Sequence, residues 1–296
     1  MKPAAFEYFA PATVDETIEL LSAHGEDAKI LAGGQSLMPL MNLRLARPRV
    51  VIDINPVSAL DYVRIGPRNE LCIGALTRQR SLEQSALVKE RNPLLAAAMP
   101  LIGHFQIRNR GTIGGSVVHA DPAAELPAVT LALGAEFVAK SAAAERVIPA
   151  AGFFLEYMTT ALRPTELLTE IRLLPLRAGC GWAIEEVARR RGDFAIVGVV
   201  ALLQVGEAGL CEDARLALFG VSERPVRAER GEQVLLGNGP EPKAFAAAAQ
   251  AVVDELDPVS DVHASGEYRR EAAAFLMKKA LHAALARARG ERVDER

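Results

Sequence analysis

The sequence predicts an α+β fold in which two N-terminal segments, each with a Gly-Gly turn, precede a C-terminal antiparallel sheet with helices. Three observations predict this fold. Residues 13–54 have the patterns of a helix, a strand, a Gly-Gly turn, a helix and a strand, which form an α/β unit. A second Gly-Gly pair follows at residues 114–115. From residue 182 the pattern changes to three apolar, strand-like runs followed by two helical ones.

The composition is that of an ordinary soluble globular protein. Half of the 296 residues are apolar and 24% are charged, so the chain can bury the cores of two or three domains. The net charge of −3 gives no general attraction to nucleic acid or to an anionic membrane. No apolar run is long enough to span a bilayer, and the N-terminus lacks a signal-peptide pattern. We therefore expect a cytoplasmic protein with no membrane span and no nucleic-acid partner.

The first predicted segment, residues 1–56, begins with a capped helix. Thr13 and Glu16 match the T-x-x-E pattern, in which each side chain can hydrogen-bond the other residue's backbone N–H. Gly25 is the expected end of this helix, because glycine tolerates the left-handed conformation found at helix ends. The apolar side chains that share one face of the helix are Val14, Ile18 and Leu21.

A short strand, a glycine turn and a second helix follow. Lys29–Ala32 is predicted to be a buried strand, and Gly33–Gly34 turns the chain. Ser36 is the expected cap of a helix that runs to about Leu43. The segment closes with a strand rich in β-branched residues, Val50–Ile54.

The second predicted segment, residues 57–175, mixes helices with strands. Ser81 and Gln84 match an S-x-x-Q cap, so we expect a helix to begin at Ser81. Pro93–Ile102 has a helical pattern that Pro100 must bend or end. The patterns further on predict one helix and two strands: Ala124–Leu133, Ala135–Ala139 and Leu167–Leu173.

The third predicted segment comprises residues 176–290 and begins within a Pro/Gly-rich break at Pro175–Gly181. A polar tail occupies residues 291–296. Ser265 is the expected cap of its last helix. The patterns predict three strands of one antiparallel sheet and two helices: Trp182–Val187, Ala195–Val205, Ala214–Val221, Lys243–Glu255 and Glu267–Arg289. The predicted buried face of the last helix carries Ala273, Leu276, Met277, Ala280, Leu281 and Ala284.

The cysteines and histidines show no metal-binding pattern. Cys72, Cys180 and Cys211 are far apart and never form a C-x-x-C pair, so we expect buried, reduced thiols. An iron–sulfur cluster usually needs four cysteine ligands, so this chain is not expected to hold one by itself. The five histidines lack the H-x-H and H-E-x-x-H spacings. No metal site is therefore predicted.

The two Gly-Gly motifs predict a binding site for a diphosphate. Backbone without Cβ atoms can turn several N–H groups toward one anion, and a helix N-terminus strengthens this attraction. Ser36, Thr112 and Ser116 add hydroxyl donors. Two such motifs on one diphosphate would hold a dinucleotide from two sides, and the alternative is that each is only a tight turn. Neither motif matches G-x-G-x-x-G or a loop ending in G-K-[ST], so a Rossmann NAD site or an NTPase is disfavoured.

Two stretches around these motifs, LAGGQSLMPLMNLRLARPRVVIDIN and RNRGTIGGSVVHADPAAELPAV, resemble the FAD-binding segments of the medium subunit of molybdenum hydroxylases. The likeness continues through RRRGDFAIVGVVALL and DVHASGEYRREAAAFLMKKAL, and it covers almost the whole chain. This family includes xanthine dehydrogenase, carbon monoxide dehydrogenase and bacterial dehydrogenases of quinoline, nicotine and related N-heterocycles. The resemblance implies a two-part FAD-binding domain of the PCMH type, followed by an α+β C-terminal domain.

The resemblance also implies which residues bind FAD. Glu125 matches an acidic position that contacts the cofactor, Leu168 an apolar position near the flavin edge, and Ile102 one beside the adenine. The first pyrophosphate loop would be Ala32, Gly33, Gly34, Gln35 and Ser36, and the second Thr112, Ile113, Gly114, Gly115 and Ser116. On this basis Gly33→Val and Gly114→Val are expected to leave the chain folded and to remove most of its flavin.

A third implied contact is a GDxA segment that approaches the isoalloxazine ring. It comprises Gly192, Asp193 and Phe194. Relatives often carry a lysine shortly before it, where this chain has Glu185 and Glu186, so Arg189 or Arg190 is the expected cation near the flavin. Two alternatives remain open: the arginines form only a solvated strand edge, and the phenylalanine is a core residue of the third segment.

No catalytic residue is predicted. His119 and Asp121 are residue types that serve as acid and base, but in a flavin electron-transfer subunit the isoalloxazine carries the redox chemistry. Asp121 is instead expected to cap the helix that follows Pro122.

The function implied by the resemblance is electron transfer. In this family a large subunit hydroxylates the substrate at a molybdenum cofactor, and two [2Fe–2S] clusters of a small subunit pass electrons to FAD. The implied assembly is a heterotrimer or a dimer of heterotrimers, and the likeness around AGGQSL and RRRGDFA favours an N-heterocycle as the substrate. One alternative is a stand-alone FAD-dependent oxidoreductase of the same fold. Another is an assembly partner that has lost flavin, which the two intact glycine motifs argue against.

Overall fold

The first part of the chain folds around a small parallel sheet. The computed structural model describes residues 2–293. The first elements are β1 (Glu7–Phe9), α1 (Val14–His24), β2 (Ala28–Leu31), α2 (Leu37–Asn42) and β3 (Val50–Asp53). The strands lie in the order β1-β3-β2 and are parallel, with Tyr8 and Lys29 both opposite Val51. The carboxyl ends of β2 and β3 therefore meet at one edge of the sheet, where the first Gly-Gly turn leaves β2.

The predicted caps of α1 are present in the structure, whereas the predicted cap of α2 is not. The Thr13 hydroxyl accepts the Glu16 N–H at 3.1 Å, and Gly25 ends α1 with a φ of 50°, so both ends of α1 are confirmed. Ser36 precedes α2, but its side chain caps no N–H group, so the predicted cap is wrong. The backbone of Ser36 has φ −106° and ψ −49° instead of the extended conformation that an N-cap normally adopts.

The second part is a five-stranded antiparallel sheet with helices against one face. Its strands are β4 (Val63–Ile65), β5 (Leu71–Gly74), β6 (Glu136–Lys140), β7 (Glu145–Pro149) and β10 (Leu167–Leu173). They lie in the order β4-β5-β10-β6-β7, and a separate short hairpin pairs β8 (Phe154–Glu156) with β9 (Thr159–Thr160). The helices are α3 (Gln79–Gln84), α4 (Ala86–Arg91), α5 (Pro93–Ala98), α6 (Phe105–Arg110), α7 (Ile113–His119) and α8 (Glu125–Ala132).

One helix start in this part was predicted wrongly. Ser81 lies inside α3, which begins at Gln79 after a residue with extended backbone, Arg78. The Gln79 N–H donates to Gly111 O at 2.9 Å, and Arg78 forms an isolated β-bridge with Thr112. This long-range pairing sets the start of the helix, so a local S-x-x-Q pattern could not reveal it. By contrast, α5 ends before Pro100 as expected, and a 3₁₀ turn follows at Met99–Leu101.

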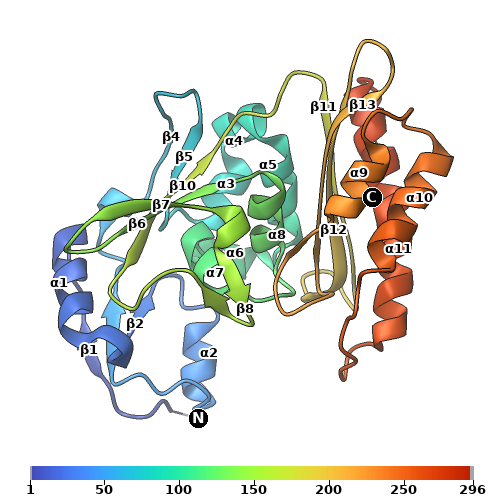
Figure 1. The fold of residues 1–296 in the computed structure, drawn as a ribbon. Helices are drawn as coiled ribbons and strands as arrows, with labels where there is room; N and C mark the ends of the chain where they lie inside the picture. The colour runs from blue at the N-terminus through green and yellow to red at the C-terminus, as the bar shows by residue number, and fades with distance from the viewer. Residues whose placement is uncertain (1, 294–296) are drawn as a thin grey trace.

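The third part is a four-stranded antiparallel sheet whose outer face is covered by helices (Figure 1). Its strands are β11 (Cys180–Ala188), β12 (Ala195–Val205), β13 (Cys211–Phe219) and β14 (Val226–Arg227), and its helices are α9 (Glu229–Leu235), α10 (Pro242–Val253) and α11 (Gly266–Ala288). The three long strands and both long helices were predicted, whereas β14 and α9 were not. Ser265 caps α11 by accepting the Tyr268 N–H at 3.1 Å, and the six predicted apolar residues of α11 are buried.

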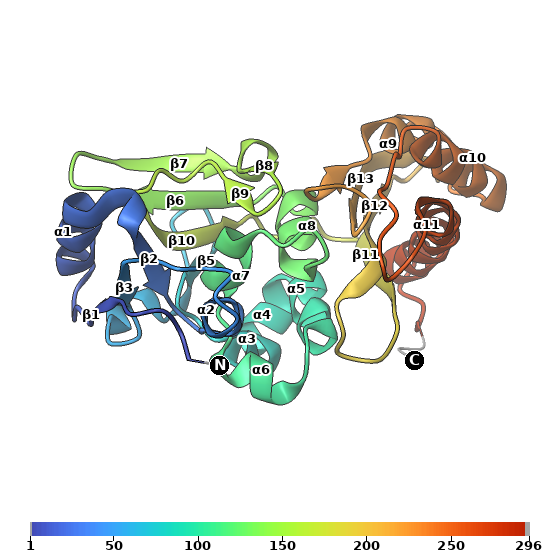
Figure 2. The same ribbon diagram turned by 90° about the horizontal axis from the view of Figure 1, so that it is seen from below.

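Three apolar cores explain how these parts hold together. One core lies between α1 and the parallel sheet, and another between the C-terminal sheet and its outer helices. The largest core contains the central helices together with Val200, Leu202 and Phe219 of the C-terminal sheet. The helices α5 and α8 thus lie between the two large sheets (Figure 2). The α+β class is confirmed, and the exact domain boundaries stay a prediction. Among residues 2–293, no helix is long and apolar enough to cross a membrane.

Candidate functional site

The first glycine motif forms an open turn between β2 and α2. Gly34 has a φ of 73°, a conformation that favours glycine, and its carbonyl accepts the Met38 N–H at 3.3 Å. Within residues 2–293, the N–H groups of Gly33, Gly34, Gln35 and Ser36 donate to no protein acceptor. Four successive free N–H groups, with the uncapped Ser36 hydroxyl beside them, are a suitable set of donors for an anion.

The second glycine motif is the first turn of α7 and not the loop that the sequence suggested. Thr112 caps this helix, and its hydroxyl accepts the Gly115 N–H at 3.0 Å. Ile113 and Gly114 donate their N–H groups to Thr77 O and Ala75 O, at 3.1 and 3.0 Å. Because these N–H groups have protein acceptors, the second motif offers an anion chiefly the Ser116 hydroxyl and the positive end of a short helix.

The two motifs lie in direct contact. A Cβ added to Gly33 would lie 2.4 Å from Arg110 O and 2.9 Å from Gly111 Cα, just before the second motif. A Cβ added to Gly115 would lie 3.8 Å from that of Ala32. The structure therefore brings together the two groups of residues that a ligand held from two sides requires.

Two polar residues that the sequence reasoning missed connect the motifs. Asn55 donates from Nδ2 to Ala32 O at 2.8 Å, and Arg78 donates to Asn55 Oδ1 and to Arg110 O, each at 2.6 Å. Burial and the charge of Arg110 lower the pKa of Arg78, whereas the charges of Asp61 and Asp53 oppose this effect, and Asp53 also lies within electrostatic reach of Arg110. The result is a positive region where the motifs meet. Asn55 could have been found from its position two residues after the end of β3, at the sheet edge that carries the first motif.

The expectation that Gly33→Val and Gly114→Val leave the fold intact is wrong. A Cβ on Gly114 would lie 2.6 Å from Ala75 O and 2.7 Å from Ala75 Cβ, so Gly114 lets α7 pack against the end of β5. At Gly33 the absence of a side chain likewise allows the close contact with Arg110 O. Both glycines are therefore required by packing, and a valine at either position would disturb the fold itself.

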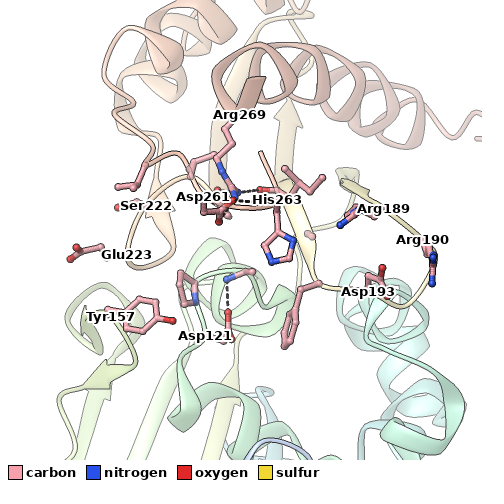
Figure 3. A pocket seen from close by; sticks show the side chains of 18 of the residues that line it. Asp121, Tyr157, Arg189, Arg190, Asp193, Ser222, Glu223, Asp261, His263 and Arg269 are labelled. Carbon is pink, nitrogen blue, oxygen red and sulfur yellow. Dashed lines mark hydrogen bonds and ion pairs between the residues drawn. The ribbon is translucent and has the colours of Figure 1, made fainter. Parts of the chain in front are cut away.

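A cavity of about 930 Å³ lies at the junction between the helices of the second part and the C-terminal sheet. Figure 3 shows Asp121 and Tyr157 on one side, and Ser222, Asp261 and Arg269 on the other. The loop between β11 and β12 forms a third wall and contributes Arg189, Arg190, Gly192, Asp193 and Phe194. Three predicted site residues, Arg190, Asp193 and Phe194, thus line one cavity.

Phe194 is an exposed residue of this wall. Its side chain is 60% exposed, which contradicts the alternative that it is a core phenylalanine. Arg189 and Arg190 are also exposed and have no ion pair within residues 2–293, so the alternative of a solvated edge fits them as well as a ligand contact does. Gly192, with a φ of 87°, turns the loop against His104, because a Cβ there would lie 2.8 Å from the imidazole.

The remaining predicted contacts are buried. Ile102 and Leu168 are only 9% and 4% exposed and belong to the largest core. Glu125 is 3% exposed at the first position of α8, and burial, with a further contribution from the charge of Asp121, raises its pKa to about 7. These side chains do not line the junction cavity, and their roles as cofactor contacts stay predictions.

The expectation that Asp121 caps α8 is wrong. Its Oδ1 accepts the Ala123 N–H at 2.9 Å, which stabilises the turn before the helix, and Ala124 is the N-cap residue. This turn follows Ala120, whose left-handed φ of 51° ends α7. Burial lowers the pKa of the neighbouring His119, although the charge of Asp121 opposes this effect. The helix α7 has seven residues and is about 10 Å long, and it extends from the second glycine motif to the turn that borders the cavity.

The thiols and the possible metal ligands add no site. Cys72 and Cys211 are buried, Cys180 is half-buried, and all three are free thiols. In the part of the chain that the structure describes, no three His, Cys, Asp or Glu side chains are grouped so that they could hold a metal ion.

Comparisons with known proteins cover almost the whole length of the chain. Residues 4–176 match the family described as the FAD binding domain in molybdopterin dehydrogenase, and residues 182–284 match the CO dehydrogenase flavoprotein C-terminal domain. The chain is 42% identical over 289 residues to the 6-hydroxypseudooxynicotine dehydrogenase complex subunit alpha of Paenarthrobacter nicotinovorans, covering 98% of this chain and 97% of the relative.

Two solved structures share the fold over almost their full length. Carbon monoxide dehydrogenase from Hydrogenophaga pseudoflava, in a form lacking the Mo-pyranopterin moiety, matches with a TM-score of 0.94 and 41% identity over 97% of this chain and 99% of that chain. Quinoline 2-oxidoreductase from Pseudomonas putida 86 matches with a TM-score of 0.92 and 35% identity, over 97% of this chain and 99% of that chain.

Proposed function

The chain belongs to the family of FAD-binding medium subunits of molybdenum hydroxylases, and from this premise we propose that it transfers electrons from the iron–sulfur clusters of a partner subunit to an external acceptor. It is thus an FAD-dependent oxidoreductase subunit. Its FAD, when bound, accepts, stores and releases electrons, and the chain's own residues hold and orient that cofactor.

The observation that carries this proposal is the donor set where the glycine motifs meet. The free N–H groups of residues 33–36 and the Ser116 hydroxyl can bind a pyrophosphate there. Arg78 and Arg110 add positive charge at the same place. Hydrogen bonds to charged groups contribute about 1.5–3 kcal/mol each, so this set suits a doubly charged pyrophosphate. The chemistry of these donors fits FAD.

The junction cavity is the proposed place of the isoalloxazine ring. It lies at the end of α7 opposite the glycine motifs, and a helix of seven residues is about 10 Å long, which suits the extent of a dinucleotide. Phe194 presents an apolar ring to this cavity, and Arg189 or Arg190 is the proposed cation near the flavin. The FAD site is proposed to be completed by Glu125, Ile102 and Leu168, and this assignment rests on the family resemblance.

The proposed partners are a small subunit with two [2Fe–2S] clusters and a large subunit with the molybdenum cofactor, assembled as a heterotrimer or a dimer of heterotrimers. The substrate of the complex is proposed to be an N-heterocycle, a choice supported by the relatives named for a nicotine derivative and for quinoline. The proposed cytoplasmic location rests on the sequence alone. A stand-alone FAD oxidoreductase is not favoured, because the relatives named as medium chains or as complex subunits span the same length.

The pyrophosphate assignment is tested by Gly34→Ala, with Gly209→Ala as its matched control. Both glycines have a φ near 75°, so both substitutions introduce a similar backbone strain, but Gly209 lies in open space in the β12–β13 hairpin. Gly34→Ala should reorient the free N–H groups and lose most of the FAD, whereas Gly209→Ala should keep it. The ratio of flavin to protein absorbance measures occupancy. Full occupancy in folded Gly34→Ala would contradict the assignment.

A further inference from the structure

One wall of the junction cavity is a segment that apolar packing does not hold. This segment, residues 257–264, lies between α10 and α11. Among residues 257–263 only Pro258 is buried, and Val259 and Val262 are 76% and 92% exposed. Because so little apolar surface is buried here, polar contacts must fix the segment. The residues that it contributes to the cavity are Val259, Asp261 and His263.

The carboxylate of Asp261 organises this segment. Its Oδ1 atom accepts the N–H groups of His263 and Ala264, at 2.8 and 3.0 Å, and the Asp261 N–H donates to Ala264 O at 3.0 Å. Burial would raise the pKa of Asp261, but hydrogen bonds from Ala264, His263 and Arg269 outweigh burial and lower the pKa. The segment is therefore a tight turn around an ionised carboxylate, whose other oxygen binds a residue outside the turn.

The partner of this carboxylate is Arg269, near the start of α11. Its Nη2 atom donates to Asp261 Oδ2 at 2.7 Å, and its Nη1 atom donates to Gly220 O at 2.7 Å and to Ile196 O. Arg269 is only 7% exposed. Figure 3 shows Arg269 bonded to Asp261, with the His263 ring pointing into the cavity. One guanidinium thus joins the segment to the ends of two strands.

Arg269 binds the C-terminal sheet where the pairing of β12 with β13 stops. The last paired residues at this end are Gly198 and Phe219, so Ile196 and Gly220 lie beyond the ladder. The guanidinium, with several N–H donors in a fixed plane, holds the two strand ends together there. Within residues 2–293, residues 257–264 form no direct hydrogen bond with the sheet, so Arg269 is the link between them.

The same strand ends carry two other walls of the cavity. Ile196 follows Phe194, the exposed ring of the loop between β11 and β12, by two residues. Gly220 donates its N–H to Pro122 O at 2.8 Å, in the turn before α8. These residues all line the cavity. Arg269 therefore contacts the backbone of two walls directly and, through Asp261, holds a third.

A neighbouring ion pair lacks these connections and provides a matched control. Arg270, next to Arg269 on α11, donates to Asp257 Oδ1 and to Leu256 O, at 2.8 and 2.9 Å. The Asp257 side chain is 97% exposed, and neither partner lines the cavity. Exposed ion pairs contribute little to stability, because water screens them. The two pairs thus join the same segment to the same helix, but only the pair of Asp261 with Arg269 reaches the sheet.

We propose that Arg269 is a positioning residue that, through Asp261, holds segment 257–264 as a fixed wall of the junction cavity and keeps His263 turned into it. This wall shields the occupant of the cavity from solvent on the C-terminal side. The hold on the segment is a property of the chain alone. That the shielded group is the isoalloxazine ring rests on the proposed function.

Hydrogen exchange of the full chain without flavin, followed by mass spectrometry, tests the hold on the segment. D261N keeps an oxygen for the N–H groups of the turn but removes the charge that binds Arg269. Peptides that cover residues 257–264 should exchange several-fold faster in D261N than in the wild type, because the segment then opens more often. In D257N they should exchange at the wild-type rate. Equal exchange in D261N and the wild type would overturn the proposal.

A second variant guards against loss of the fold in D261N. Removing one partner of an ion pair leaves the buried charge of Arg269 uncompensated, whereas R269Q/D261N removes both charges. This double variant should show the same faster exchange in peptides that cover residues 257–264. Loss of the fold in both variants, or faster exchange throughout the C-terminal sheet, contradicts a role confined to the cavity wall.

The shielding itself is measured with FAD bound. Iodide quenches flavin fluorescence on contact, so the extent of quenching reports the access of solvent to the ring. D261N should keep near-normal FAD content, because the pyrophosphate donors lie elsewhere, and iodide should quench it several-fold more than the wild type. D257N carries the same change of charge and should match the wild type. Equal quenching in D261N and D257N refutes the shielding even where the exchange result holds. Absence of FAD from the wild type would instead count against the proposed function.

Discussion

Phe194 shows how a single side chain connects the sheet to the cavity. Its neighbour Ala195 begins β12 and is 4% exposed, whereas Phe194 itself is 60% exposed and projects from the loop into the cavity. A planar apolar ring at this place can pack on another planar ring, and such aromatic contacts contribute about 0.5–1.5 kcal/mol beyond the area they bury. Because the pyrophosphate donors lie elsewhere, we expect Phe194 to affect the surroundings of the flavin more than its retention.

The substitution Phe194→Ala should therefore leave FAD content near normal and change the rate at which the reduced flavin is reoxidised by its acceptor. Phe275→Ala is the control, because this phenylalanine is 63% exposed on α11 and does not line the cavity. Flavin absorbance gives the content, and stopped-flow absorbance gives the reoxidation rate. A collapse of FAD content with unchanged reoxidation of the remainder would show that Phe194 anchors the cofactor.

At the scale of elements, α7 is a helix that its own residues disfavour. Glycine costs about 1 kcal/mol relative to alanine in a helix, and α7 has two glycines in its first turn. The helix forms because Thr112 caps it and because Ile113 and Gly114 donate to the backbone of residues 75–77. Gly114 allows the close approach of α7 to Ala75, and Gly115 leaves room for the Thr112 hydroxyl that caps the helix. Packing between elements thus decides a conformation that local propensity opposes.

This account predicts that Gly114→Ala destabilises the chain even though alanine favours helices. The added Cβ would lie 2.6 Å from Ala75 O, a backbone atom that cannot move freely, and overpacking of this kind costs about 1–3 kcal/mol. Gly152→Ala is the control, because its Cβ would meet nothing within 4 Å. Urea unfolding followed by circular dichroism compares the two. Equal midpoints would mean that α7 can shift away from β5 at little cost.

At the scale of the whole molecule, the C-terminal sheet joins two cores. Val200 and Leu202 face the central helices, whereas Val199 and Ala201 face α9–α11, so β12 is apolar on both sides. The backbone of the two parts is also connected, since Gly220 donates its N–H to Pro122 O at 2.8 Å beside the cavity. The cavity is therefore built from both parts, and a change in their packing alters its walls.

The sequence predicts what local patterns determine. The strands β3, β10 and β12 and the helices α1, α10 and α11 were found from their apolar periodicity and caps, because each buries one clear face or stretch. The helices α6 and α7, the start of α3 and the roles of Asn55 and Arg78 were not found. Each of these depends on a contact with a residue far away in the chain, such as Gln79 with Gly111 or Asn55 with Ala32. The glycine motifs were found, but the packing role of Gly114 became visible only in the structure.

The most direct test of the electron-transfer function is the visible flavin spectrum of the isolated chain under anaerobic conditions, recorded before and after partner subunits are added. The chain should purify with bound FAD and without iron or molybdenum, and N-heterocycles or carbon monoxide should leave its flavin oxidised. Addition of the iron–sulfur and molybdenum subunits with the substrate of the complex should then bleach the flavin. Bleaching by a substrate without any partner would contradict the account and identify a stand-alone flavoenzyme.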